Sequence, residues 1–282
     1  MTAFSPTAAR LALSIDVEDW FQVENLRAAV PASSWSQREL RVEQNTARML
    51  QALSEQNVRG TFFVLGWVAE RCPELVRRIV ASGHELGCHG YGHDLLNKLT
   101  PDAFREDLKR AKGLLEEHTG SRVLGYRAPS FSITDWAIDV LKEEGFAYDS
   151  SAFATVAHDR YGKLQGLERG EPITELRDDF YEVSISSLNV FGHSLPWGGG
   201  GYFRLLPYAV FKTGIREILR RGDPYIFYIH PWEIDPAQPR VQVRASYAFR
   251  HYLNLDRCFA RFQALLSDFR WGTIRELLPA ER

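Results

Sequence analysis

The sequence predicts an α/β fold built around a mainly parallel sheet. Strand-like apolar runs alternate with segments of helical periodicity, which is the pattern of βα units. A chain of 282 residues is a routine length for one large α/β domain, and no repeat, low-complexity tract or Pro/Ser-rich linker divides it. We therefore expect a single domain over residues 1–282.

Seven short segments have the apolar, β-branched and aromatic composition of strands. The first is the apolar run that precedes a group of three acidic residues, and the last lies close to the C-terminus. The predicted strands are Leu11–Asp16, Thr61–Leu65, Glu85–Cys88, Arg122–Tyr126, Tyr181–Ile185, Tyr225–His230 and Trp271–Ile274.

Six segments with helical periodicity lie between these strands. The pairs Thr100-Pro101 and Thr134-Asp135 are typical of helix starts, and Gly83, Gly120 and Gly145 stand where a glycine ends a helix. The predicted helices are Val42–Gln56, Pro73–Ala81, Pro101–Glu117, Asp135–Glu144, Pro207–Arg220 and Leu253–Ser267.

Two long segments, residues 150–178 and 186–206, break this alternation. The second contains four consecutive glycines between Trp197 and Tyr202. Long irregular connections in a compact domain are usually lids or binding loops, and glycines permit close approach of the backbone. A surface excursion without function is the alternative interpretation.

Composition excludes several classes of protein. The chain has 34 Lys and Arg against 36 Asp and Glu, so it lacks the positive field expected of a nucleic-acid-binding protein. Its apolar runs are too short to span a membrane, and the N-terminus MTAFSPTAAR lacks the features of an export signal. Three scattered cysteines without CxxC spacing argue against a disulfide framework. We therefore expect a cytoplasmic protein.

Polar side chains that could carry chemistry follow four of the predicted strands. In a parallel α/β fold the active site forms where the carboxyl ends of the strands meet. We therefore expect these residues to lie together; they are Asp16, Glu18 and Asp19 after the first strand, His89 and His93 after the third, Arg127 after the fourth, and His230 after the sixth.

His89 and His93 have i, i+4 spacing, which on a helical turn places both imidazoles on one side. Two histidines and a carboxylate from another strand form a ligand set known for zinc and similar cations. A carboxylate that lies near the cation without binding it can act as a general base, and Asp16 is our candidate.

Arg127 and His230 each allow two interpretations. Arg127 could orient Asp16 through parallel hydrogen bonds, or could form an ordinary surface ion pair. His230 could be a general acid for a leaving amine, or a histidine that only packs in the core.

The ordered motifs "SIDVEDW", "HGYGH", "RAPSFS" and "HPWE" resemble those of the metal-dependent polysaccharide deacetylases. Members of this carbohydrate esterase family remove N-acetyl or O-acetyl groups from glycans. The variant "DVEDWF", the glycine-rich loop and "HPWEI" are most similar to a subgroup encoded with exopolysaccharide export and protein-sorting systems in Gram-negative bacteria. The resemblance implies a distorted (β/α)7-type barrel over residues 11–235, with residues 236–282 packed on it as an extension.

The resemblance also implies roles for single residues. Asp16 is the expected base, Arg127 orients it, His89 and His93 bind the metal, and His230 is the acid. A main-chain amide near Ser130 is the expected stabiliser of the oxyanion.

The sequence departs from the usual family pattern at two places. Val17 separates the first two acidic residues, so the third metal ligand is either Glu18 or Asp19. Strand alternation places Glu18 on the same face as Asp16, but the chain could already be turning at Asp19. Gly90 replaces a hydroxyl residue, which removes a hydrogen bond that would fix the loop.

The expected function is hydrolysis of N-acetyl groups on a polysaccharide or its oligosaccharide precursor, with a divalent cation, preferably zinc, as cofactor. Aromatic residues in or near the long loops, among them Trp197, Tyr202 and Trp232, are candidates for stacking on sugar rings, or else they pack in the core or a lid. A hydrolase of small linear or cyclic amides and a glycan-binding protein without catalysis are the alternatives.

Overall fold

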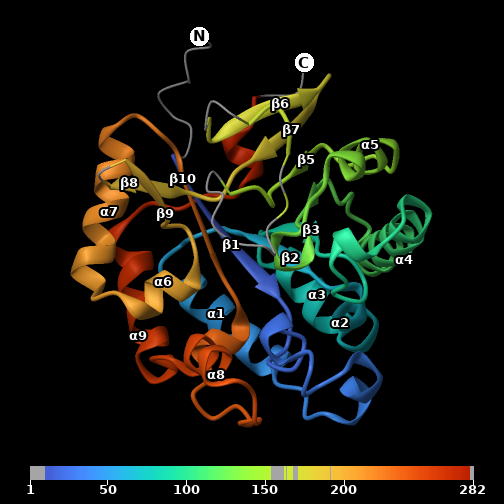
Figure 1. Ribbon diagram of the computed structural model, residues 1–282, viewed down its shortest axis with the longest axis horizontal. Helices are drawn as coiled ribbons and strands as arrows, with labels where there is room; N and C mark the ends of the chain where they lie inside the picture. Colours follow the sequence, from blue (N-terminus) through green and yellow to red (C-terminus); the bar gives the residue numbers. More distant parts are fainter. Residues whose placement is uncertain (1–9, 154–161, 163, 168–170, 191, 280–282) are drawn as a thin grey trace.

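The computed structural model describes residues 10–153, 162, 164–167, 171–190 and 192–279. Within these residues the chain forms a curled sheet of eight strands with the order β10-β1-β2-β3-β4-β5-β7-β6 (Figure 1). Every neighbouring pair is parallel except β6 with β7. The strands are β1 Leu11–Val17, β2 Thr61–Val64, β3 Glu85–Cys88, β4 Gly125–Tyr126, β5 Tyr148–Asp149, β6 Ile173–Arg177, β7 Phe180–Val183 and β10 Tyr225–Ile229.

The sheet curves into a half-barrel, which confirms the predicted α/β class and distorted barrel. The segment after β7 returns toward β10, where the backbone N–H of Ile226 donates to Oγ of Ser186 at 2.8 Å. A separate antiparallel hairpin follows, formed by β8 (Ser187–Val190) and β9 (His193–Pro196).

Alternation along β1 separates the outer core from the barrel interior. Leu11, Leu13, Ile15 and Val17 belong to the large cluster that packs with the helices, whereas Ala12 belongs to a second cluster with Phe63 and Ile226 from the neighbouring strands. Because successive side chains point to opposite faces, Asp16 lies on the same face as Ala12. The sheet therefore directs Asp16 into the interior of the half-barrel.

Helices cover the outer face of the sheet. Figure 1 shows α6, α7 and α9 on the side of β10, and α2, α3, α4 and α5 on the side of β2 to β5. The helices are α1 Val42–Glu55, α2 Gly66–Arg71, α3 Pro73–Ala81, α4 Pro101–Thr119, α5 Asp135–Glu143, α6 Gly200–Leu205, α7 Tyr208–Arg220, α8 Ala245–Tyr252 and α9 Leu255–Asp268. Among the described residues, no helix is both long enough and apolar enough to cross a membrane.

The predicted helix ends are mostly confirmed. Oγ1 of Thr100 accepts a hydrogen bond from the backbone N–H of Ala103 at 3.2 Å. Gly83, Gly120 and Gly145 all have positive φ, which glycine adopts without a steric penalty. Thr134 precedes α5 as predicted, but its hydroxyl does not cap the helix.

Several predicted elements differ from the structure. Trp271–Ile274 is no strand, because only Gly272 pairs with β1, in an isolated bridge to Ala12. Residues 186–206 are not irregular throughout, since they contain β8, β9 and the whole of α6. Within the predicted irregular segment 150–178, the structure contains the strand β6. Residues 154–161, 163 and 168–170 of this segment lie outside the described residues. Short helices α2 and α8 were not expected from periodicity because each has fewer than three turns.

Candidate active site

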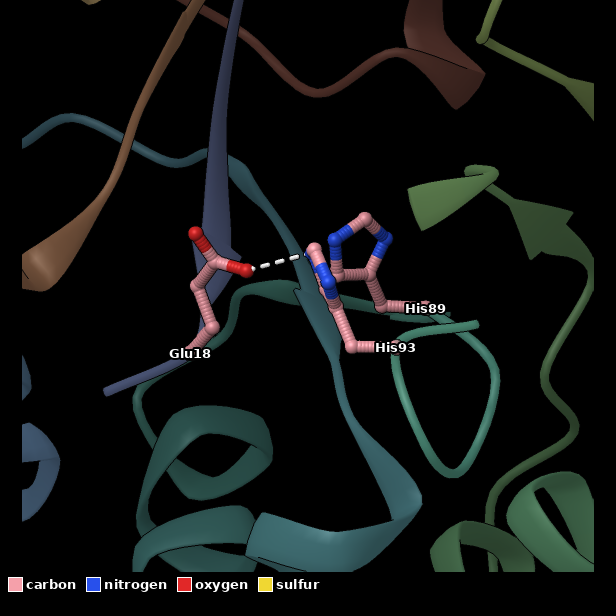
Figure 2. Close-up of side chains that lie close together, drawn as sticks. All are labelled: Glu18, His89 and His93. Atoms are coloured by element: carbon pink, nitrogen blue, oxygen red, sulfur yellow. Dashed lines mark ion pairs between the residues drawn. The ribbon is translucent and has the colours of Figure 1, made fainter. Parts of the chain in front are cut away.

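Glu18, His89 and His93 form a compact buried group at the carboxyl ends of β1 and β3. One potential ligand atom from each residue lies within 4.8 Å of those from the other two. Figure 2 shows the carboxylate of Glu18 directed at the ring of His93, where Oε2 lies 2.7 Å from Nε2. The predicted meeting of strand ends therefore brings these three side chains together.

The two imidazoles converge without a helical turn. Residues 89–95 have no regular secondary structure, and His93 adopts a left-handed backbone conformation with φ of 53°. The expected i, i+4 helical geometry is wrong here, because the chain turns sharply after β3 rather than forming a helix. The ring centroids of the histidines nevertheless lie 5.4 Å apart.

Asp107 of α4 fixes the loop that carries the histidines. Its carboxylate accepts hydrogen bonds from the backbone N–H groups of Tyr91 at 2.8 Å and Gly92 at 3.3 Å. A Cβ atom on Gly90 would lie 2.9 Å from this carboxylate, and Gly90 has positive φ. The glycine thus permits the approach of Asp107, whose hydrogen bonds hold the loop in place of the missing hydroxyl residue.

His89 is held in the form that binds metals. Its Nδ1 lies 2.8 Å from the carbonyl oxygen of Arg127, which can only accept, so Nδ1 carries the proton. Burial lowers the pKa of His89 to about 4, so the ring is neutral near pH 7. The lone pair of Nε2 is then available to a cation.

Asp16 and Arg127 form a buried ion pair. Nη1 of Arg127 donates to Oδ1 of Asp16 at 2.7 Å, and the side chains are 1% and 0% exposed. This geometry excludes the surface interpretation of Arg127. Asp16 does not belong to the group of potential ligands, which leaves its carboxylate beside that group with Arg127 as its partner.

Asp19 points away from the histidines. Its Oδ2 accepts hydrogen bonds from the backbone N–H groups of Arg41 at 2.7 Å and Val42 at 2.9 Å, and Oδ1 accepts from Trp20. Asp19 thereby satisfies amides at the start of α1, which normally lack partners within the helix. Of the two acids left open by the sequence, the structure places Glu18 with the histidines and Asp19 at a helix terminus.

His230 follows β10 and faces both acids. Its Nε2 lies 3.8 Å from Oδ2 of Asp16 and 3.6 Å from Oε1 of Glu18, and 16% of its side chain is exposed. Nδ1 lies 2.9 Å from Oε2 of Glu233. Burial alone would lower the pKa of His230, but the hydrogen bond to Glu233 and the nearby carboxylates raise it to about 9. His230 is therefore protonated at neutral pH, as a general acid requires.

Glu233 and Arg204 are site residues that the sequence analysis missed. Nε of Arg204, from α6, donates to Oε1 of Glu233 at 2.8 Å, and both side chains are 2% exposed. Burial raises the pKa of Glu233, but Arg204 and His230 outweigh it and lower the pKa to about 2. The motif "HPWE" contained a signal, because Glu233 stands three residues after the histidine and can fold back onto it.

The glycine run packs closely against β10 and Glu233 instead of forming a free loop. A Cβ atom at Gly198 would lie 2.4 Å from the carbonyl oxygen of Ile226, and one at Gly200 would lie 2.1 Å from Oε2 of Glu233. No side chain fits at these positions. The glycines therefore allow α6 to approach the site and to place Arg204 against Glu233.

The aromatic candidates for sugar stacking lie mostly in the interior. Trp197 is stacked on Phe211 with ring centroids 5.7 Å apart, and Trp232 lies between the rings of His230 and His251. Both are less than one tenth exposed, so neither offers a free ring face to a sugar. Tyr202 is half-buried in α6 and packs against the large core cluster.

Ser130 lies in a strained turn beside the site. Ser130 and Phe131 have positive φ values of 51° and 60°, which residues other than glycine rarely adopt. Such conformations cost of the order of 1–3 kcal/mol each and gather at functional sites. Ser130 itself is half-buried.

The donor set fits a divalent cation. Two imidazoles and one carboxylate match the ligands of zinc sites that retain open positions. Within the described residues, no hydrogen bond satisfies the buried Oε2 of Glu18, although His93 lies beside it. Because buried polar atoms are normally bonded, this oxygen is a suitable ligand for a cation.

Family models match two successive parts of the chain. Residues 35–148 match the model described as Polysaccharide deacetylase, and residues 150–279 match the model described as Domain of unknown function (DUF3473). Residues 35–148 are therefore similar to the polysaccharide deacetylase family. Among the site residues, His89, His93 and Arg127 lie within the first match, His230 lies within the second, and Asp16 and Glu18 precede both.

Curated proteins are similar to parts of this sequence. A peptidoglycan-N-acetylglucosamine deacetylase of Bacillus cereus is 30% identical over 120 residues, which cover 37% of this chain and 44% of that protein. This chain spans less than half the length of the first curated relatives it matches.

Solved structures share the fold over nearly the whole chain. A protein of Mycobacterium smegmatis described as a candidate polysaccharide deacetylase has a TM-score of 0.61 and 22% identity, covering 98% of this chain and 91% of that one. A pseudoenzyme of the CE4 family from Bacillus anthracis has a TM-score of 0.52 and 16% identity, covering 99% of this chain and 68% of that one. The same architecture thus occurs in a protein described as a pseudoenzyme, so activity has to be argued from the site.

Proposed function

We propose that this chain is a metal-dependent hydrolase that removes N-acetyl groups from an acetylated polysaccharide or its oligosaccharide precursor. One observation carries the proposal: a buried group of two histidines and Glu18 lies beside Asp16, held by Arg127, and beside His230, held by Glu233. This arrangement supplies potential metal ligands, a base and an acid in one place.

When held by Glu18, His89 and His93, a divalent cation supplies Lewis acidity that polarises an acetyl carbonyl and lowers the pKa of water to about 7. Asp16 accepts one proton as the oxygen of water attacks the acetyl carbon. Arg127 orients the Asp16 carboxylate during this step through the hydrogen bond from Nη1. A main-chain amide near Ser130 is the proposed donor to the carbonyl oxygen of the substrate.

His230 completes the reaction as the acid. Its raised pKa keeps a proton on the ring, and its 16% exposure leaves the ring accessible to substrate. The carbon–nitrogen bond breaks, the nitrogen takes the proton from His230, and the products are acetate and a free amine.

The finer assignments rest on the ligand types and on the resemblance of the motifs. Zinc is the proposed cation because it is commonly bound by histidine and carboxylate with positions left open. The motif "DVEDWF" supports a role in exopolysaccharide biosynthesis.

The test combines metal analysis with acetate release from a panel of N-acetylglucosamine oligomers. Asp16→Asn is expected to reduce turnover by about 10²- to 10⁴-fold while the metal content is retained, because the ligands are untouched. His89→Ala is expected to lose both metal and activity. Chelation should abolish acetate release, and added divalent metal should restore it.

Each alternative has its own outcome in this test. Ring opening of small amides without acetate release would favour the small-amide hydrolase. Glycan binding without turnover in the metal-loaded protein would favour a non-catalytic protein. Full activity of Asp16→Asn would remove the assignment of the base.

A further inference from the structure

We infer that Trp232 is a positioning residue for Glu18, and that His251 from the C-terminal segment holds Trp232 in place. The inference rests on the proposed metal site but concerns residues that lie outside it. Nε1 of Trp232 donates a hydrogen bond to Oε1 of Glu18 at 3.0 Å. The indole thus occupies one carboxylate oxygen and leaves Oε2 directed at His93.

Glu18 needs such a restraint because its carboxylate ends a flexible side chain located just beyond β1. Without a donor on Oε1, rotation of the terminal carboxylate would allow either oxygen to face the histidines or neither. Hydrogen bonds to the second oxygen of a ligand carboxylate fix its orientation and tune its affinity for metal. Glu18 is 2% exposed, so water is a poor substitute for the indole N–H.

The indole of Trp232 is itself stacked with two histidine rings. Its ring is stacked on that of His230 at 5.2 Å with an interplanar angle of 26°, and on that of His251 at 4.3 Å with an angle of 12°. The carbonyl oxygen of Trp232 accepts a hydrogen bond from Nε2 of Gln238 at 2.7 Å. The plane of the indole, and with it the direction of the N–H, is therefore set by its neighbours.

His251 is a neutral ring with a defined orientation. Burial lowers the pKa of His251 to about 3. Its Nε2 lies 2.7 Å from Oε1 of Gln238, and Nε2 of the same glutamine donates to the carbonyl oxygen of Trp232. The glutamine thus joins both rings of the stack.

This chain of contacts gives the C-terminal segment a role in the site. Gln238 and His251 belong to residues 236–282, which the sequence presents only as an extension packed on the barrel. They also lie within residues 150–279, the part that matches a domain of unknown function. Their contacts lead through Trp232 to Glu18, so this segment constrains a proposed metal ligand.

The test compares two variants that remove the same group from different buried tryptophans. Trp232→Phe removes the donor to Glu18 and retains an aromatic ring. Trp197→Phe is the matched control, because Nε1 of Trp197 donates to the carbonyl oxygen of Phe211 and makes no contact with Glu18. Zinc dissociation constants are measured for the full chain by competition with a chromogenic chelator.

We expect Trp232→Phe to weaken zinc binding by about 10- to 100-fold, and Trp197→Phe to bind as the wild type does. His251→Ala should weaken binding in the same direction, since the indole loses the ring on one face. This second variant decides the question if Trp232→Phe does not fold.

Wild-type affinity in both Trp232→Phe and His251→Ala would overturn the inference and leave the proposed function intact. Equal weakening in Trp197→Phe would also overturn it, because the effect would then come from general destabilisation. A wild-type protein that binds no divalent metal would remove the proposed function, and the inference with it.

Discussion

Arg127 is a buried cation whose guanidinium donates hydrogen bonds to two residues of β1 and to Ser150, which directly follows β5. Its guanidinium donates to Oγ of Ser14 at 2.6 Å, to Asp16 at 2.7 Å, and to the carbonyl oxygen and Oγ of Ser150 at 2.8 Å each. The carbonyl oxygen of Arg127 also accepts a hydrogen bond from Nδ1 of His89. One residue therefore orients the proposed base and one potential metal ligand.

Replacing Arg127 by Met should be strongly destabilising. The change leaves the buried Asp16 carboxylate without its cation, and breaking a buried pair in this way costs about 3–5 kcal/mol. The free energy of unfolding, measured by urea denaturation, is expected to fall by that amount. Arg177→Met is the control, since its ion pair with Asp139 is exposed and contributes about 1 kcal/mol or less. Losses of similar size in the two variants would contradict the assignment.

The glycine run at the start of α6 allows a matched pair of substitutions. A Cβ atom at Gly200 would lie 2.1 Å from Oε2 of Glu233, which Arg204 and His230 hold in place, whereas Gly201 is exposed with nothing within 4 Å. Gly200→Ala should therefore cost about 1–3 kcal/mol through overpacking.

Gly201→Ala should instead stabilise the protein by about 0.5–1 kcal/mol, because alanine loses less backbone entropy in a helix. Thermal unfolding of both variants, followed by circular dichroism, measures the difference. Activity should also fall in Gly200→Ala, since the partner of His230 is displaced. Equal melting temperatures for the two variants would show that α6 does not approach Glu233 as described.

Strands β5 and β7 carry a buried pair of acids that the proposed reaction does not use. Asp149 and Glu182 are paired in register and fully buried. Oε1 of Glu182 accepts hydrogen bonds from the backbone of Ser151 and Ala152, and Oδ1 of Asp149 accepts one from the hydroxyl of Ser151. Burial raises the pKa of both acids, and the charge of Asp149 raises that of Glu182 further. The pair therefore retains a proton at a pH where a free carboxyl group has lost it.

This pair should make stability depend on pH. The folded chain holds a proton that the unfolded chain releases above its ordinary pKa of 4.5, so the contribution is full below that pH and is lost as pH rises through the raised pKa. Glu182→Gln cannot lose a proton, so its stability relative to the wild type should increase as pH rises from acid to neutral. Urea unfolding across this range measures the difference.

The control for the acid pair is Glu175→Gln on β6, which replaces an exposed carboxyl group outside the buried pair. If the difference in unfolding free energy between Glu182→Gln and the wild type does not change with pH, the two acids do not share a proton as described.

The eight-stranded sheet contains strands from both regions matched by the family models. The first match ends at residue 148 and the second begins at residue 150, yet β5, which spans this boundary, pairs with β7. The strand β1, which carries Asp16, pairs with β10 on one side and with β2 on the other. Neither matched region contains the whole site or a complete sheet.

A fragment of residues 1–149 should therefore fail to fold. It would lack β10, leaving the apolar strand β1 at an open edge, and would lose α7 and α9 from the outer core. We expect no cooperative thermal transition by circular dichroism, against a clear transition for the full chain. A cooperative transition in the fragment would show that its half of the sheet is stable alone.

The sequence alone determined the α/β class and five of the residues that meet in the site. Apolar runs and cap residues mark the strands and helices through local preferences, which act over a few neighbouring residues. Because the ends of parallel strands meet at one edge of a sheet, Asp16, His89, His93, Arg127 and His230 could be expected together from their positions after strands.

The tertiary structure decided what each side chain touches. The choice between Glu18 and Asp19 depended on the turn after β1, which directs one acid to the histidines and the other to the amides of α1. Glu233 and Arg204 became site residues only in the folded structure, where they contact each other and Glu233 contacts His230. Trp232, a sequence candidate for stacking on sugar, instead donates to Glu18. A local sequence pattern cannot predict such contacts. Burial and hydrogen-bond partners depend on which distant segments pack together in the folded chain.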